Sequence, residues 1–171
     1  MVKGEQANAI GDGNDAYGHF TQSVGDDNKV YADHSLGYGA HNKVGAQRVT
    51  GTPEKDVVVD KNTSKASVFG LNNEVVGKNI FVAGNNNKIT DTSTSNATVI
   101  GFGATASSAN ATSIGTAASA LANETVAIGQ AAKASGQNSN AYGSSSECEW
   151  YKFIGCRYWF CCLWRFSCSD W

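Results

Sequence analysis

Small residues recur along this chain every seven positions, and that spacing limits the accessible folds more than any other feature. In the N-terminal part the series contains only glycine and alanine: Gly4, Gly11, Gly18, Gly25, Ala32, Gly39 and Ala46. It returns with Gly70, Gly77 and Gly84, and further on the anchor pairs stand 14 residues apart: Ile100-Gly101, Ile114-Gly115, Ile128-Gly129 and Tyr142-Gly143. Because glycine suits tight turns, the series predicts a turn in each half-repeat.

Asparagine repeats in phase with these glycines. Two groups have internal spacings of 14 residues, and they comprise Asn14, Asn28, Asn42, Asn73 and Asn87. Val, Ile and Thr alternate with other residues around each glycine, which indicates short strands, whereas the 3.6-residue period of a helix is absent. Stacked strands lie ~4.8 Å apart, so an asparagine amide can bond the amide of the next repeat.

The sequence therefore predicts an all-β fold, a parallel β-solenoid whose 14-residue rungs each consist of two seven-residue halves. We expect rungs over residues 1–46 and 67–146, an insertion over 47–66, and a bulge of three extra residues within "DTSTS" before Gly101. A disordered Gly/Ser/Asn-rich tract is the alternative, but disorder does not keep β-branched residues in phase over so long a stretch.

Composition excludes some functions. The net charge of −2 and the pI near 5.9 do not suggest binding to nucleic acid or an anionic membrane. No apolar run is long enough for a membrane-spanning helix, and the first residues do not resemble a secretory signal. Each rung also has few large apolar residues to offset a backbone entropy of ~1–2 kcal/mol per residue. We therefore expect several chains to share a core as a homo-oligomer.

The segment "ATVIGFGATASSANATSIGTAASALANETVAIGQAAKASGQNSNAYG", residues 97–143, resembles the head repeats of trimeric autotransporter adhesins, the YadA-like heads of Gram-negative bacteria. Residues 4–46 and 67–90 are similar through their glycine series and Asn-Lys-Val elements. The resemblance implies a left-handed parallel β-roll, a homotrimer, and adhesion to host matrix or cells and bacterial clumping. It implies no catalytic activity, no cofactor and no metal, and it places the full-length parent in the outer membrane at the cell surface.

Collagen-binding heads of that family use repeated Asn-Ser-Val-Ala-Ile-Gly-Ser motifs. The nearest match here is Val126-Ala127-Ile128-Gly129, a candidate ligand-facing motif, but Glu124, Thr125 and Gln130 depart from the family pattern. Adhesion to matrix or cell surfaces in general is therefore the expectation. Since the sequence presents no signal, stalk heptads or anchor, we read it as a head fragment, with an inactive truncated gene remnant as the alternative.

Residues 147–171 differ sharply from the rest, because all five cysteines and all four tryptophans lie there. The cysteine spacing does not match a zinc site. A disulfide knot and an interfacial membrane segment are further alternatives. We favour a frameshift: codons that encode Cys156-Arg157-Tyr158-Trp159 can encode Ala-Ala-Ile-Gly when they are shifted by one base.

Other functional motifs are weak. A hexapeptide-repeat acyltransferase needs a six-residue period and a catalytic histidine, and an ice-binding solenoid needs threonines in register, and neither pattern is present. "GDGND" around Asp12 lacks the remaining ligands of a calcium loop, so we interpret it as a polar turn. His19, His34 and His41 fall at different phases of the repeat, which predicts solvent-facing side chains and no metal site.

Overall fold

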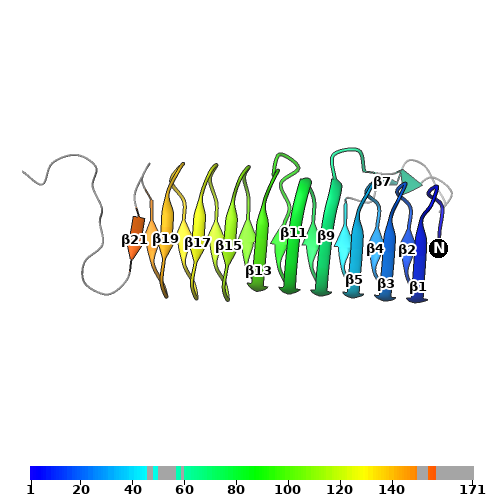
Figure 1. Ribbon diagram of the computed structural model, residues 1–171, viewed down its shortest axis with the longest axis horizontal. Coiled ribbons are helices and arrows are strands. Elements are labelled where there is room, and N and C mark those ends of the chain that lie inside the picture. Colours follow the sequence, from blue (N-terminus) through cyan, green and yellow to red (C-terminus); the bar gives the residue numbers. More distant parts are fainter. Residues whose placement is uncertain (46–47, 50–56, 59, 150–153, 157–171) are drawn as a thin grey trace, which may run out of the picture.

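The computed structural model describes residues 1–45, 48–49, 57–58, 60–149 and 154–156, which form strands and turns without a helix. The strands follow one another along a single axis, so the described chain is a long, narrow stack (Figure 1). No helix that could span a membrane occurs in these residues. The predicted all-β parallel solenoid with a 14-residue repeat is confirmed.

Two parallel sheets form the walls of the stack. The sheet with the longer strands, here the long-strand sheet, has this order: β1 (Asn8–Asp12), β3 (Gln22–Asp26), β5 (Leu36–Ala40), β9 (Ser64–Leu71), β11 (Lys78–Asn85), β13 (Thr98–Phe102), β15 (Thr112–Ile114), β17 (Val126–Ile128), β19 (Asn140–Tyr142) and β21 (Ile154–Cys156). The short-strand sheet contains two-residue strands: β2 (Asp15–Ala16), β4 (Lys29–Val30), β6 (Lys43–Val44), β10 (Glu74–Val75), β12 (Lys88–Ile89), β14 (Thr105–Ala106), β16 (Ser119–Ala120), β18 (Lys133–Ala134) and β20 (Glu147–Cys148). One strand of each sheet makes up a rung.

Glycines of successive rungs lie directly over one another. This glycine column comprises Gly11, Gly25, Gly39, Gly70, Gly84, Gly101, Gly115, Gly129 and Gly143. Every φ in the column lies between +106° and +152°, which L side chains rarely adopt. A Cβ on Gly84 would also lie 1.9 Å from the carbonyl oxygen of Gly101. Both the conformation and the close approach therefore require glycine.

The seven-residue period comes from two equivalent corners in each rung. At both corners one residue has a left-handed conformation with φ near +55°, as in His34 and His41, which stand seven residues apart. Asparagine adopts this conformation more readily than most residues and occupies it at Asn72, Asn79 and Asn86. The same turn geometry thus closes both halves of the 14-residue repeat.

Asparagine fills part of the core in the N-terminal rungs. The Nδ2 of Asn28 donates to Oδ1 of Asn14 at 3.1 Å, and the Nδ2 of Asn42 donates to Oδ1 of Asn28 at 2.8 Å. Asn73 continues the ladder on Asn42 at 2.9 Å, and the backbone N–H of Asn87 donates to Oδ1 of Asn73 at 3.0 Å. All five side chains are buried, and each Nδ2 also donates to a glycine carbonyl of a neighbouring rung.

Alanine replaces asparagine in the core beyond Asn87. The Oδ1 of Asn87 accepts the backbone N–H of Ala104 at 2.9 Å, and this bond ends the ladder. The following rungs bury mainly alanine: Ala104, Ala106, Ala111, Ala118, Ala120, Ala127, Ala132, Ala134 and Ala141. Their strands in the long-strand sheet shorten to three residues from β15 onward. A rung of this part therefore buries less apolar surface than one with valine and asparagine.

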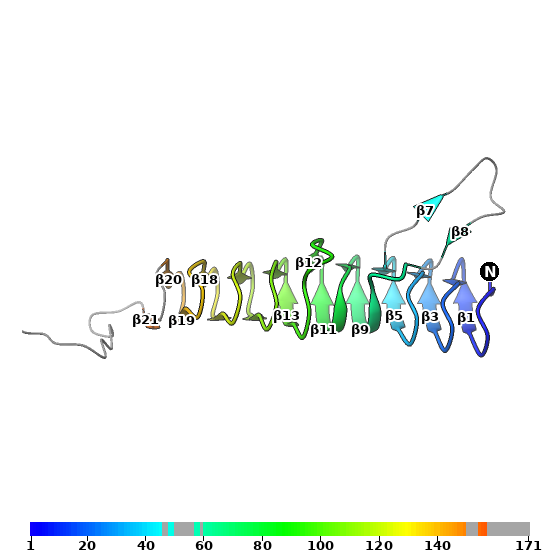
Figure 2. The same ribbon diagram turned by 90° about the horizontal axis from the view of Figure 1, so that it is seen from above.

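Two insertions leave the solenoid at one corner. Asn73 follows Asn42 in the ladder after 31 residues in place of 14, and Ala104 follows Asn87 after 17. The longer insertion carries β7 (Arg48–Val49) and β8 (Val57–Val58), an antiparallel pair that stands away from the stack (Figure 2). Residues 47, 50–56 and 59 of the predicted insertion, and residue 46 directly before it, lie outside the described part of the chain.

Both insertions return to the stack through the same Asp-x-x-Thr turn. The Oδ1 of Asp60 accepts the backbone N–H of Asn62 at 2.9 Å, and Oδ1 of Asp91 accepts that of Ser93 at 2.8 Å. The backbone N–H of Ser93 and then its hydroxyl both donate to Oδ1 of Asp91, and these two hydrogen bonds hold the pKa of this carboxyl below its usual range. Residues 60–66 already belong to the solenoid, so the insertion ends earlier than its predicted boundary at residue 66, whereas the short bulge lies where "DTSTS" was expected.

The solenoid also extends past Ser146. Strand β20 pairs with β18 and β21 with β19, each at the 14-residue spacing, and Cys148 takes the core position of Ala134. The first residues of the segment predicted as an aberrant tail thus continue the stack, because a short β-rung depends on small or apolar residues at few positions. The hypotheses about residues 150–153 and 157–171 fall outside the described residues.

We expect Gly84→Ala to destabilise the protein by more than about 3 kcal/mol, because the new Cβ collides with backbone and φ is +120°. Gly103→Ala is the matched control. Its φ is +65°, no atom lies near the added Cβ, and alanine already occupies the equivalent positions 117 and 131. That change should cost about 1 kcal/mol. Chemical denaturation measures both, and equal losses would contradict the role of the glycine column.

Asn42→Asp should destabilise the protein by about 3 kcal/mol or more. The isosteric carboxylate cannot donate to Asn28 Oδ1 or to the carbonyl of Gly70, and it would be buried. Asn86→Asp, at an exposed corner, is the control and should change stability by less than about 0.5 kcal/mol. Thermal unfolding followed by circular dichroism distinguishes the two, and a stable Asn42→Asp protein would disprove the importance of the ladder.

Candidate functional site

The described residues do not gather catalytic or metal-binding side chains. No group of three His, Cys, Asp or Glu side chains that could hold a metal is found among them. His19 and His34 lie at one corner and His41 at the other, and all three are exposed. The ring of His34 stacks on Phe20 with centroids 5.0 Å apart, and Nδ1 of His19 accepts the backbone N–H of Glu5. These contacts are typical of a surface corner.

Ion pairs among the described residues involve partly exposed side chains, as between Nδ1 of His19 and Oε2 of Glu5 at 3.9 Å. Burial is the main cause that raises the pKa of Tyr31 to about 12, so this phenol stays neutral at physiological pH. Asp12 accepts the backbone N–H of Gly13, which makes "GDGND" a polar turn. The candidate functional regions are therefore the extended outer faces of the two sheets and the corners between them.

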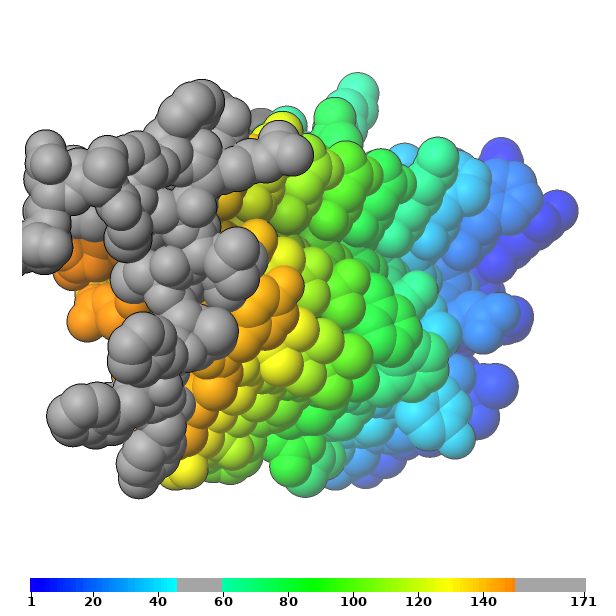
Figure 3. Space-filling view, turned by 60° about the vertical axis from the view of Figure 1, so that its left-hand side comes forward, coloured from blue at the N-terminus to red at the C-terminus, as the bar shows by residue number. Residues whose placement is uncertain are grey.

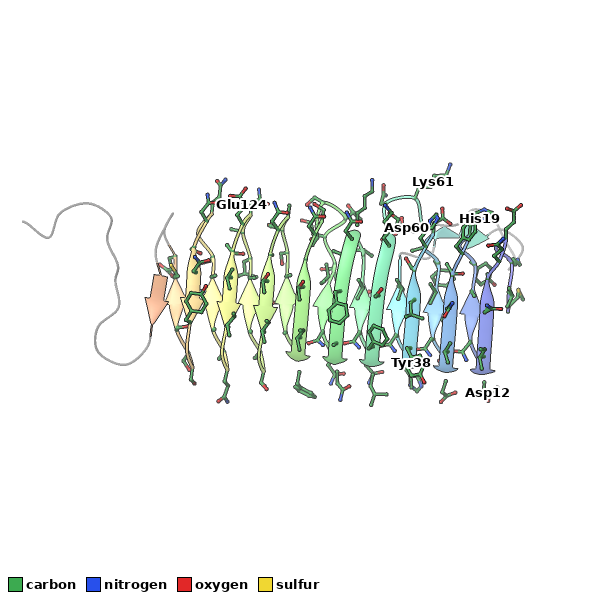
Figure 4. The ribbon with its side chains drawn as sticks, in the orientation of Figure 1. Asp12, His19, Tyr38, Asp60, Lys61 and Glu124 are labelled. Carbon is green, nitrogen blue, oxygen red and sulfur yellow. The ribbon has the colours of Figure 1, made fainter. Side chains whose placement is uncertain are left out.

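The outer face of the long-strand sheet carries a row of large apolar side chains. This apolar column comprises Ile10, Val24, Tyr38, Phe69, Ala83, Ile100, Ile114, Ile128 and Tyr142. Tyr38 is 53% exposed and Ile100 and Ile128 are 37% exposed, although neighbours above and below cover part of each side chain. In Figure 4 Tyr38 lies on this face, with Asp12 at one edge and Glu124 at the opposite edge.

A second outward column runs beside the apolar column, two residues earlier in each strand. It contains Asn8, Gln22, Leu36, Ser67, Phe81, Thr98, Thr112, Val126 and Asn140. Neither column contains Asp, Glu, Lys, Arg or His. The two columns together form an uncharged and largely apolar face that continues over nine rungs, and stacked side chains run in rows along the molecule (Figure 3).

The short-strand sheet presents the opposite chemistry. Each of its strands has one outward residue, and these are Asp15, Lys29, Lys43, Glu74, Lys88, Thr105, Ser119, Lys133 and Glu147. Glu74 lies between Lys43 and Lys88, with Nζ–Oε distances of 3.8 and 3.6 Å. Charged groups on an exposed face contribute little to stability but remain well hydrated, so this sheet suits contact with water.

Lys133 and Glu147 form the shortest ion pair on this face. Their Nζ and Oε1 atoms lie 2.5 Å apart in adjacent rungs. This hydrogen bond, followed by the Coulomb attraction, raises the pKa of Lys133 and lowers that of Glu147. Both residues therefore stay charged over the neutral range and keep the outer face of the short-strand sheet polar even where the core contains only alanine.

One corner displays an exposed polar ladder. The Nδ2 of Asn79 donates to Oδ1 of Asn96 at 3.0 Å, and the Nδ2 of Asn96 donates to Oδ1 of Asn110 at 3.1 Å. Asn123 continues the series, since its Oδ1 accepts the backbone N–H of Ala109. Hydrogen bonds between rungs thus fix the orientation of these surface amides, which leaves them less entropy to lose when a ligand binds.

The candidate motif at residues 126–129 lies partly on the surface. Val126 and Ile128 point outward from β17 and Gly129 belongs to the glycine column, but Ala127 is fully buried in the core. Ala127 therefore cannot contact a ligand, because neighbouring residues of a strand point to opposite faces. The same alternation places Ile100, Ile114 and Ile128 outside the core of this chain, so these isoleucines add little to its buried apolar surface.

The sequence predicts alternation along each strand, but it does not say which of the two faces is buried. Once the residue before each anchor isoleucine is taken as the buried one, alternation alone puts the isoleucines outside.

A comparison with protein-family models finds no match for this sequence, and a comparison with curated proteins finds none either.

Proposed function

We propose that this chain forms the head of a non-enzymatic surface adhesin, built from identical copies and displayed at the cell surface by a longer outer-membrane parent. The resemblance of residues 97–143 to YadA-like head repeats supports this proposal. The solenoid architecture with 14-residue rungs is compatible with it. The uncharged face of the long-strand sheet is the observation that carries it furthest.

That face has the composition of a subunit interface. Interface centres are depleted in charged residues and enriched in aliphatic and aromatic ones. Here two outward columns of nine residues each contain no Asp, Glu, Lys, Arg or His, whereas seven of nine outward residues of the short-strand sheet are charged. Contiguous apolar surface of this kind marks a binding site rather than a surface exposed to water.

Three copies that face a common axis would bury this surface. Each copy would then present its short-strand sheet and its corners to the exterior, and rotation by 120° would close the assembly. Association also supplies the apolar burial that an alanine core lacks, particularly from Ala104 onward.

The adhesive surface in this proposal comprises the outward-facing corners and the short-strand sheet. The Asn79–Asn96–Asn110 ladder and the serines and threonines around it repeat similar polar groups at each rung. A repeated surface of this kind can bind an extended ligand through many weak contacts, and three copies multiply them. Matrix proteins and glycan-bearing cell surfaces offer such extended ligands.

The purified chain should sediment as a trimer, and Ile114→Lys should convert it to a folded monomer. Ile114 lies in the apolar column with its side chain outside the core, so the charge would affect association rather than the fold of one chain. Ser119→Lys, on the outer face of the short-strand sheet, is the matched control and should remain a trimer. Analytical ultracentrifugation gives the mass. A monomeric unmodified protein would disprove the oligomeric head.

Beads coated with the protein should bind immobilised matrix proteins and cultured cells more strongly than beads coated with albumin. In solution, the monomeric Ile114→Lys protein should bind the same surfaces at least about tenfold more weakly than the unmodified protein, because it lacks the avidity of three linked copies. If the unmodified trimer binds neither matrix nor cells above the albumin background, the adhesive function is wrong while the oligomer stands.

A further inference from the structure

One rung departs from the side-chain pattern of the long-strand sheet. Eight of the nine residues in the apolar column are larger than alanine, and the exception is Ala83 in β11. The same strand carries Phe81 in the adjacent outward column, which contains no other aromatic residue. In this rung the small side chain therefore lies in the apolar column, and the large side chain lies in the adjacent outward column.

Ala83 has the smallest side chain in the apolar column, and its position between larger neighbours is here called the notch. Its Cα partners are Phe69 in β9 and Ile100 in β13, so a methyl group lies between a benzyl and a sec-butyl side chain. Phe81 forms a protrusion beside the notch. Its side chain is 41% exposed, and its ring contacts that of Phe69 with centroids 6.0 Å apart.

We propose that the Phe81 ring of each copy fills the notch at Ala83 of the adjacent copy and thereby fixes the copies in one register. This inference rests on the proposed homotrimer. The protrusion and the notch lie at the same height on the same strand, so parallel copies with equal rungs at equal heights bring them together. No charged group lies on either side of the contact, because both columns are uncharged.

Other registers lose this fit. A shift by one rung places Phe81 against the level of Phe69 or Ile100 and leaves Ala83 without a partner. The three rungs that follow discriminate poorly, since Ile100, Ile114 and Ile128 repeat the same side chain at successive levels. Overpacking at one level and an unfilled notch at another both disfavour the shifted assembly.

A disulfide test examines this contact directly. Chains with Phe81→Cys and chains with Ala83→Cys are unfolded, mixed, refolded and oxidised, and peptides are identified by mass spectrometry. A disulfide between position 81 of one chain and position 83 of another is expected. The control pairs Phe81→Cys with Ile114→Cys, which lies two rungs further along the stack, and should yield no such link.

Energetic coupling provides the second measurement. Phe81→Thr should weaken the trimer about tenfold or more by emptying the notch, and Ala83→Ile should do so by closing it. The double variant Phe81→Thr/Ala83→Ile recreates the Thr-Val-Ile sequence of Thr98–Ile100 and should recover at least most of the loss. Trimer dissociation is followed by dilution and ultracentrifugation.

The outcomes separate the two proposals. If the unmodified protein is a monomer, the oligomeric head fails and this inference fails with it. If the protein is a trimer but lacks the 81–83 link, or if the two substitutions are additive, only the register contact is wrong. A link together with recovery in the double variant supports it.

Discussion

The close contact between the backbones of successive rungs at the glycine column is the constraint on which the rest of the structure depends. The carbonyl of each glycine occupies the space where a Cβ of the preceding one would lie, at 1.9 Å for Gly84 over Gly101. This contact sets the 14-residue spacing and aligns like positions along the axis. The two corners of every rung have the same left-handed turn geometry, so each rung follows the same path as the one before it. Residues at equivalent positions therefore form columns along the axis, both in the core and on the surface.

Alignment gives a small set of residue types a large effect. Five asparagines satisfy one another inside the N-terminal rungs, and the ladder continues unbroken across the longer insertion because Asn73 bonds Asn42. Beyond Asn87, buried alanines fill the core of each rung, and they bury less side-chain surface than asparagine and valine do. Outside, the same alignment collects apolar residues in one column of the long-strand sheet and charged residues in the outward column of the short-strand sheet. The difference between these faces motivates the proposed head of identical copies, and the exchange of sizes at Phe81 and Ala83 suggests how the copies keep register.

Much of this could be predicted from the residues alone. The Gly101, Gly115 and Gly129 spacing predicted stacked rungs, and Asn14, Asn28 and Asn42 predicted side-chain amides bonded between them. A residue type that recurs at a fixed spacing is a strong sign of stacked rungs, since each rung places the same structural requirement on the equivalent position. Boundaries were harder: the return of the insertion at Asp60 and the continuation of the stack through Cys156 depend on short local pairings that leave little trace in composition.

The sequence by itself determined the period, the strand class and the glycine positions, because a residue without Cβ is required wherever backbones meet. Only the tertiary structure decided which way each side chain points. Ile128 and Ala127 are adjacent hydrophobic residues, and either could have been the buried one. The register of the rungs decides, because stacking Gly129 in the glycine column fixes the phase of alternation, which turns Ala127 into the core and Ile128 onto the outer face of the long-strand sheet.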